Sequence, residues 1–112
     1  MGLKVLVIDD ERDICSLLDK FLTSKGYEVS TASTLTDGLR MMAETEPNIL
    51  FLDNNLPDGL GWDKVETIQE ILPSCKINLI SAYKFVPGSI KDNPSIKLIE
   101  KPISFASLMD YL

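Results

Sequence analysis

The fold is decided by one stretch of sequence, Asn48-Ile49-Leu50-Phe51-Leu52-Asp53-Asn54-Asn55-Leu56-Pro57-Asp58-Gly59-Leu60-Gly61. Four apolar residues lead to the carboxylate of Asp53, and a loop rich in glycine and proline follows. Short continuous apolar runs are typical of strands that are covered on both faces of a parallel sheet. Because open α/β folds place their chemistry at the carboxyl ends of such strands, we predict that Asp53 is a functional carboxylate at that edge.

A second strand also ends on acidic residues. Residues 4–8 (Lys-Val-Leu-Val-Ile) read as a strand, and Asp9 and Asp10 follow it directly. Three like charges at one sheet edge repel one another unless a cation lies among them. Since carboxylate oxygens are the usual ligands of Mg²⁺ and Ca²⁺, the pattern indicates a cation site formed by Asp9, Asp10 and Asp53.

The rest of the chain alternates strands and helices. Strands are predicted at residues 4–8, 28–32, 49–53, 76–81 and 96–100, and helices at residues 11–25, 34–46, 61–72 and from 104 onward. This alternation predicts an α/β fold with a doubly wound, five-stranded parallel sheet in the flavodoxin-like order 2-1-3-4-5. The first and third strands are neighbours in that order, which would bring the three acids together.

Two segments give more specific structural expectations. In helix 11–25, helical spacing predicts an inward-facing apolar surface made of Ile14, Leu17, Leu18, Phe21 and Leu22. Residues 84–95 contain two prolines and a glycine, so we expect the fourth helix to be shortened or irregular.

Composition limits the possible functions. With 112 residues, the chain has the size of a single domain, and we expect one over residues 1–112. The formal net charge of −6 argues against a nucleic-acid-binding surface, which needs clustered lysine and arginine. The sequence contains no histidine, which excludes serine–histidine catalysis and histidine-ligated zinc.

The expected location is the cytoplasm. Cys15 and Cys75 lie far apart in the sequence and are interpreted as free thiols of a reducing compartment. No apolar run approaches the ~20 residues of a membrane span, and the first residues lack the pattern of a signal peptide. We therefore expect no interaction with membranes.

Along its whole length the sequence resembles the receiver domain of two-component response regulators, the CheY-like family. Each matching motif follows a predicted strand. The motifs are the pair Asp9-Asp10, the loop Asp53-x-x-x-Pro57-Asp58-x-x-Gly61, Ser81 at the end of the fourth strand, and Lys101-Pro102 after the fifth. A single one of these motifs is weak evidence, whereas all of them in this order form a specific pattern.

The resemblance implies a role for each site residue. Asp53 would accept a phosphoryl group from a sensor histidine kinase or a histidine phosphotransfer protein, and the domain would signal to an unknown target without being an enzyme in its own right. Lys101 and Ser81 would contact phosphoryl oxygens.

The resemblance also implies Mg²⁺ as the cofactor. Asp10, Asp53 and the backbone carbonyl of Asn55 would be its ligands, and Asp9 would act through a bound water.

Simpler interpretations of single residues remain open at this point. Asp10 could cap the following helix, and Ser81 could be an ordinary strand-end hydroxyl. Lys101 could form a surface ion pair, and Asn54-Asn55 could be a turn.

Two other functions also remain open. A phosphorylation-independent interaction module is suggested by Leu98, where the family often has an aromatic residue, and by the irregular segment 84–95. These departures imply that any switch would be carried by loop motion. A haloacid-dehalogenase-like phosphatase fits poorly, because that family needs a second aspartate where this chain has Asn55.

Overall fold

The computed structural model describes residues 2–82, 88, 92–101, 103–108 and 112. Its main sheet has five parallel strands in the order β2-β1-β3-β6-β7, which is the order 2-1-3-4-5 predicted from sequence. The strands are β1 (Lys4–Ile8), β2 (Glu28–Ala32), β3 (Ile49–Asp53), β6 (Lys76–Ser81) and β7 (Ile96–Glu100).

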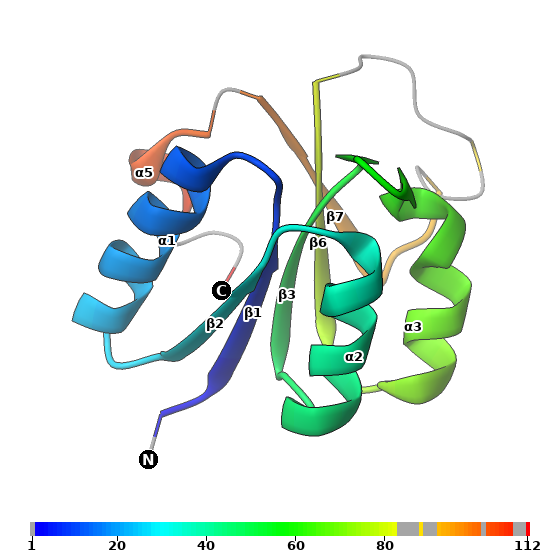
Figure 1. Cartoon of the computed structure of the whole chain (residues 1–112), viewed down its shortest axis with the longest axis horizontal. Coiled ribbons are helices and arrows are strands. Elements are labelled where there is room, and N and C mark those ends of the chain that lie inside the picture. Colours follow the sequence, from blue (N-terminus) through cyan, green and yellow to red (C-terminus); the bar gives the residue numbers. More distant parts are fainter. Residues whose placement is uncertain (1, 83–87, 89–91, 102, 109–111) are drawn as a thin grey trace.

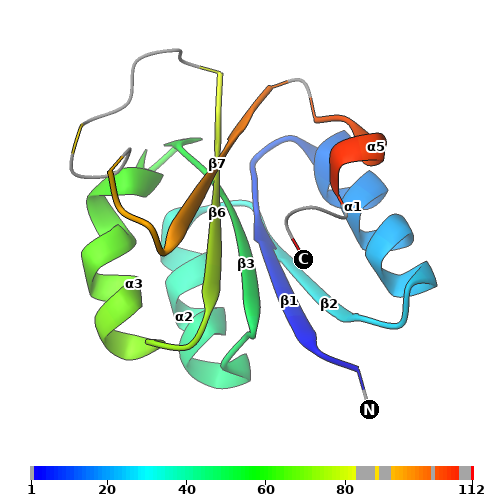
Figure 2. The same ribbon diagram turned by 180° about the vertical axis from the view of Figure 1, so that it is seen from behind.

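Helices cover both faces of this sheet, as a doubly wound fold requires. α1 (Arg12–Ser24) and α5 (Phe105–Leu108) lie on one face, and α2 (Leu35–Thr45) and α3 (Val65–Ile71) lie on the other (Figures 1 and 2). The sheet therefore separates two apolar layers. On β1, Val5 and Val7 belong to the layer that contains α1, whereas Leu6 and Ile8 belong to the layer that contains α2.

Local residues account for the start of α2 and for the ends of α1 and α2. The hydroxyl of Thr34 accepts a hydrogen bond from the Asp37 N–H at 3.1 Å, which caps the start of α2. α2 ends at Thr45 and is followed by Glu46 in the left-handed region, one residue before Pro47. Gly26 follows α1 with a φ of 94°, a conformation that favours glycine.

Three details differ from the sequence-based expectation. The predicted helix 61–72 begins as a 3-10 turn, η1 (Gly61–Lys64), and becomes α-helical only in α3. A short antiparallel hairpin, β4 (Asn55–Leu56) with β5 (Gly59–Leu60), was not predicted, because two-residue strands carry no periodicity. Leu17 was expected to face inward but is 50% exposed, since it lies about 100° around the helix from the buried Leu18.

The predicted fourth crossover lies largely outside the described residues. Of residues 83–95, the structure describes only Gly88 and residues 92–95. The expectation of a shortened or irregular fourth helix therefore stays a prediction. Within the described part of the chain, no helix has the length and apolar character needed to cross a bilayer.

Candidate functional site

The sheet brings the three predicted acids together. β1 pairs directly with β3, and the register sets Ile8 opposite Leu52, so the residues that follow these positions lie next to each other. Each of Asp9, Asp10 and Asp53 has a carboxylate oxygen within 4.8 Å of the others. Asp9 and Asp53 are buried, being 1% and 2% exposed, whereas Asp10 is exposed. The predicted acidic cluster is therefore present at the carboxyl edge of the sheet.

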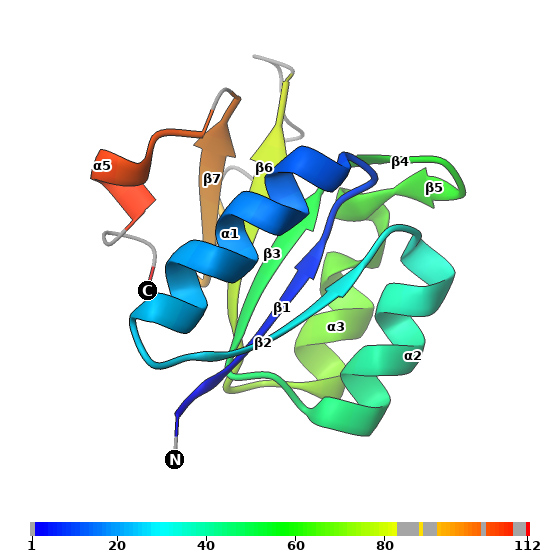
Figure 3. The same ribbon diagram turned by 60° about the vertical axis from the view of Figure 1, so that its left-hand side comes forward.

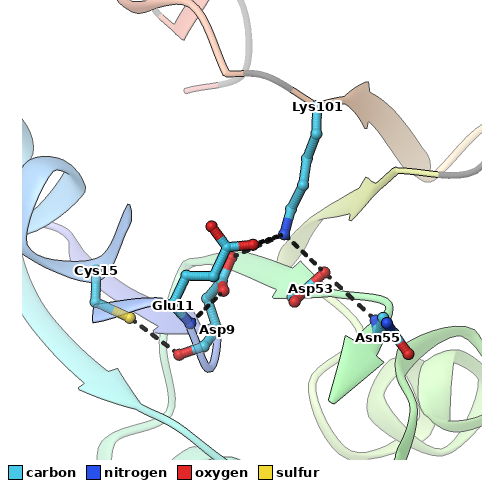
Figure 4. A network of polar contacts seen from close by, with 6 residues as sticks. All are labelled: Asp9, Glu11, Cys15, Asp53, Asn55 and Lys101. Carbon is cyan, nitrogen blue, oxygen red and sulfur yellow. Dashed lines mark hydrogen bonds and ion pairs between the residues drawn. The ribbon is translucent and has the colours of Figure 1, made fainter. Parts of the chain in front are cut away.

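Lys101 reaches this cluster from the end of β7. Its Nζ lies 3.5 Å from Asp53 Oδ1 and 3.9 Å from Asp9 Oδ2 (Figure 4). Its backbone N–H donates to the Ser81 carbonyl at 3.0 Å, which fixes the start of its side chain at the sheet edge. The ammonium group therefore lies beside Asp53.

The charges at the site are set mainly by burial. Burial raises the pKa of Asp9 to about 6, although a hydrogen bond from the Glu11 N–H to its Oδ1 at 2.9 Å opposes the shift. Burial also raises the pKa of Asp53, and the charge of Lys101 works against it. For Lys101 burial lowers the pKa, but the surrounding carboxylates of Glu11, Asp9 and Asp53 outweigh burial and raise it.

The donor set fits a hard divalent cation. Asp9 Oδ2 is buried and has no hydrogen-bond partner among the described residues. A buried carboxylate oxygen in that state is uncommon, because buried polar atoms are usually paired. The Asp9 carboxylate lies with two further carboxylates in a cluster of oxygen ligands, which is the chemistry that Mg²⁺ and Ca²⁺ prefer.

The loop after Asp53, residues 54–61, is called the acceptor loop below. The N–H of Asn55 donates to Asp53 Oδ1 at 3.3 Å, so the loop turns back over the carboxylate (Figure 4). At the other end of the loop, a Cβ on Gly61 would lie 2.7 Å from the Asp53 carbonyl oxygen. Only glycine allows this close approach, which explains its place in the motif.

Ser81 occupies the position expected from sequence, at the end of β6. It is 4% exposed, and it follows Ile80, which pairs with Asp53 in the register of β3 and β6. Its hydroxyl therefore belongs to the strand next to the acceptor strand, at the same edge of the sheet.

A comparison with known families agrees with this geometry. The family model of the response regulator receiver domain matches residues 5–112. The chain belongs to this family.

Similar proteins place the receiver domain within longer regulators. Transcriptional regulatory protein KdpE of Mycobacterium tuberculosis is 51% identical over 59 residues, which is 53% of this chain and 26% of KdpE. Across KdpE and five other curated relatives, the region matched by this chain covers between 22% and 48% of the relative's length.

Solved structures show the same fold. A CheY-like receiver domain from Methanospirillum hungatei has a TM-score of 0.88 at 25% identity, covering 98% of this chain and 90% of that one. Response regulator TrrA of Thermotoga maritima, in complex with Mg²⁺-BeF, has a TM-score of 0.79 at 26% identity, covering 98% and 95%.

Sequence reasoning missed one residue of the receiver site. Glu11 Oε1 accepts a hydrogen bond from Lys101 Nζ at 2.8 Å, the shortest contact of that ammonium group among the described residues (Figure 4). The available signal was its place directly after the acidic pair. The two residues lie 90 positions apart, however, so no local pattern joins them.

One of the simpler interpretations can now be assessed. The N-cap of α1 is Glu11 and not Asp10, and the side chain that bonds to this turn is that of Asp9, so the capping role considered for Asp10 is wrong. Two other residues named from sequence have different outcomes. Leu98 is half-buried and packs against the apolar layer that contains α2 and α3.

Pro102, which follows Lys101 in the motif, lies outside the described residues.

Proposed function

We propose that this receiver domain accepts a phosphoryl group on Asp53, from a sensor histidine kinase or a histidine phosphotransfer protein, with Mg²⁺ bound. The observation that carries the proposal is the surroundings of Asp53. A buried carboxylate at the end of a central strand has two acids within 4.8 Å and a lysine ammonium at 3.5 Å. Such a set offers oxygen ligands for a cation and a positive charge for a phosphoryl group beside one nucleophile.

The transfer exchanges one bond for another. An Asp53 carboxylate oxygen forms a bond to phosphorus while the bond from phosphorus to the donor's imidazole nitrogen breaks, and the electron pair of that bond leaves with the imidazole. The product is an acyl phosphate. Lys101 provides a positive charge for a phosphoryl oxygen, and the Ser81 hydroxyl donates a hydrogen bond to another.

Mg²⁺ would be held by Asp10, Asp53 and the Asn55 backbone carbonyl, with Asp9 contributing through a water. When bound, it offsets the repulsion between the carboxylates and the incoming phosphoryl oxygens. The chain's own contribution is to keep these oxygen donors close together and, on Asp9 and Asp53, out of solvent.

Phosphorylation would then change how the domain binds a downstream protein. The domain does not turn over a substrate of its own and serves as a signalling module. Apart from Leu98, which suggested it from sequence, no described residue supports the alternative of a phosphorylation-independent interaction module.

The proposal is tested by incubation with a small acyl phosphate, with and without Mg²⁺. The expected result is one added phosphoryl group per chain by intact mass, formed only with Mg²⁺ and removed by hydroxylamine. Asp53→Asn should abolish it. Equal labelling of wild type and Asp53→Asn would refute the assignment.

A further inference from the structure

The base of the acceptor loop is closed by the loop's own hydrogen bonds. The Gly61 N–H donates to the Asn54 carbonyl at 2.8 Å, and the Trp62 N–H donates to Asn54 Oδ1 at 3.0 Å. Between these ends, Asn55 pairs with Leu60 in the β4–β5 hairpin. The base therefore holds its shape, but none of these bonds ties the tip of the loop to the rest of the domain.

The tip is attached to α2 by Asp58. Its Oδ1 accepts from the Leu35 N–H at 2.7 Å, and its Oδ2 accepts from the Thr36 N–H at 2.8 Å and from the Thr36 hydroxyl at 2.7 Å. Figure 3 shows the β4–β5 hairpin beside the start of α2. One carboxylate thus makes three hydrogen bonds to a segment more than 20 residues away in sequence.

These bonds satisfy donors that a helix cannot satisfy itself. The first N–H groups of an α-helix have no partner within the helix, and in α2 Thr34 serves only the N–H of Asp37. Asp58 accepts hydrogen bonds from the two N–H groups before that of Asp37, which are those of Leu35 and Thr36. The bonds from the Thr36 hydroxyl and then from the Thr36 and Leu35 N–H groups lower the pKa of Asp58 to about 2, so the carboxylate is charged at neutral pH.

The start of α2 is itself a firm attachment point. Leu35 and Met42 are buried in the apolar layer beneath the helix. The strand before it, β2, ends at Ala32, whose carbonyl accepts from the Asp9 N–H at 3.0 Å. Through α2, the tip of the acceptor loop is therefore tied to the same frame that positions Asp9.

We infer that Asp58 is a positioning residue, which anchors the acceptor loop to α2 and thereby keeps the Asn55 backbone in place beside Asp53. The part of this inference that concerns the metal rests on the proposed function, because the Asn55 carbonyl is the expected ligand. The part that concerns the loop does not depend on it.

Asp58→Ala is the direct test, and Asp37→Ala is its matched control. Asp37 is an exposed acid in the first turn of the same helix, so its loss removes the same charge from the start of α2 without touching the anchor. Thr36→Val is a milder variant that removes one of the three bonds and keeps the two backbone bonds.

Two readouts separate the anchor from the proposed function. In protein without Mg²⁺, Asp58→Ala should speed amide exchange at Asn55, Gly61 and Trp62. In a Mg²⁺ titration followed by calorimetry, it should weaken binding about tenfold, as expected for a group that orients a metal ligand. Thr36→Val should give a smaller change of the same sign, and Asp37→Ala should match wild type in both measurements.

The inference is overturned if amide exchange in Asp58→Ala equals that of wild type, or if Asp37→Ala changes it as much. If Asp58→Ala does not fold, Thr36→Val decides by the same criteria. If wild type binds no Mg²⁺, the proposed function fails, and the exchange data still decide whether Asp58 holds the loop.

Discussion

The ammonium group of Lys101 lies closer to Glu11 than to Asp53. Its Nζ is 2.8 Å from Glu11 Oε1 and 3.5 Å from Asp53 Oδ1. Before phosphorylation, an exposed carboxylate that is not part of the acidic cluster therefore competes for the cation that a phosphoryl group on Asp53 needs.

Replacing Glu11 should release Lys101 toward Asp53. The Glu11 side chain is 55% exposed, and an ion pair at such a site is worth up to about 1 kcal/mol. Glu11→Gln should therefore speed phosphorylation of Asp53 by roughly two- to fivefold, measured by intact mass against time. Glu44→Gln, which removes an exposed acid far from the site, is the control. A rate that stays equal or falls would show that Glu11 does not compete.

Removing Lys101 should affect metal binding and phosphorylation in opposite directions. In Lys101→Met, the phosphorylation rate should fall by at least about tenfold, because a charge for the phosphoryl oxygens is lost. Mg²⁺ should bind more tightly, because a cation 3.5 Å from Asp53 no longer repels it. Weaker Mg²⁺ binding in this variant would mean that Lys101 has a structural role.

Asp10 should matter more than Asp9 for Mg²⁺ affinity. Asp9 Oδ1 is already engaged by the Glu11 N–H, whereas the Asp10 side chain is exposed and closes the cluster from the solvent side. Asp10→Asn should weaken binding more than Asp9→Asn does, as measured by calorimetry. Both variants should raise the thermal midpoint of the Mg²⁺-free domain, because each removes one of three neighbouring negative charges. Equal losses of affinity would contradict the difference in roles.

The stabilisation from Asp58 should disappear in acid. Hydrogen bonds lower its pKa from 3.8 to about 2, so the folded state favours the charged form. Its contribution is therefore complete above pH 4 and is lost as the pH falls toward 2. Urea unfolding of wild type and Asp58→Ala at pH 7, 4 and 2.5 should give a free-energy difference that is similar at the first two values and much smaller at the third. An equal difference at pH 2.5 would argue against the charged anchor.

The sheet and the acidic cluster could be predicted from sequence because they depend on local patterns. A strand's apolar run and the acid that ends it are adjacent, and the parallel strand order then determines which acids meet. This reasoning placed Asp9, Asp10 and Asp53 together, as the structure does. Lys101 was added by the family resemblance, and its ammonium group lies 3.5 Å from Asp53.

Side-chain hydrogen bonds between segments far apart in the sequence were beyond that reasoning. Glu11 and Lys101 meet across 90 residues, and Asp58 reaches Leu35 across 23. Each contact depends on which of several nearby donors and acceptors lie within hydrogen-bond distance in the folded chain. The chain has 17 acidic residues, and the sequence alone does not show which of them makes such a contact. The motif included Asp58, but its partner on α2 required the folded structure.

The central claim is that Asp53 accepts the phosphoryl group, and chemical mapping of that group tests it most directly. The labelled domain is reduced with borohydride, which converts an aspartyl phosphate to homoserine, and is then digested and sequenced by mass spectrometry. We predict homoserine at position 53 and unchanged aspartate at positions 9 and 10. Homoserine at either of those positions, or none anywhere after demonstrated labelling, would contradict the claim.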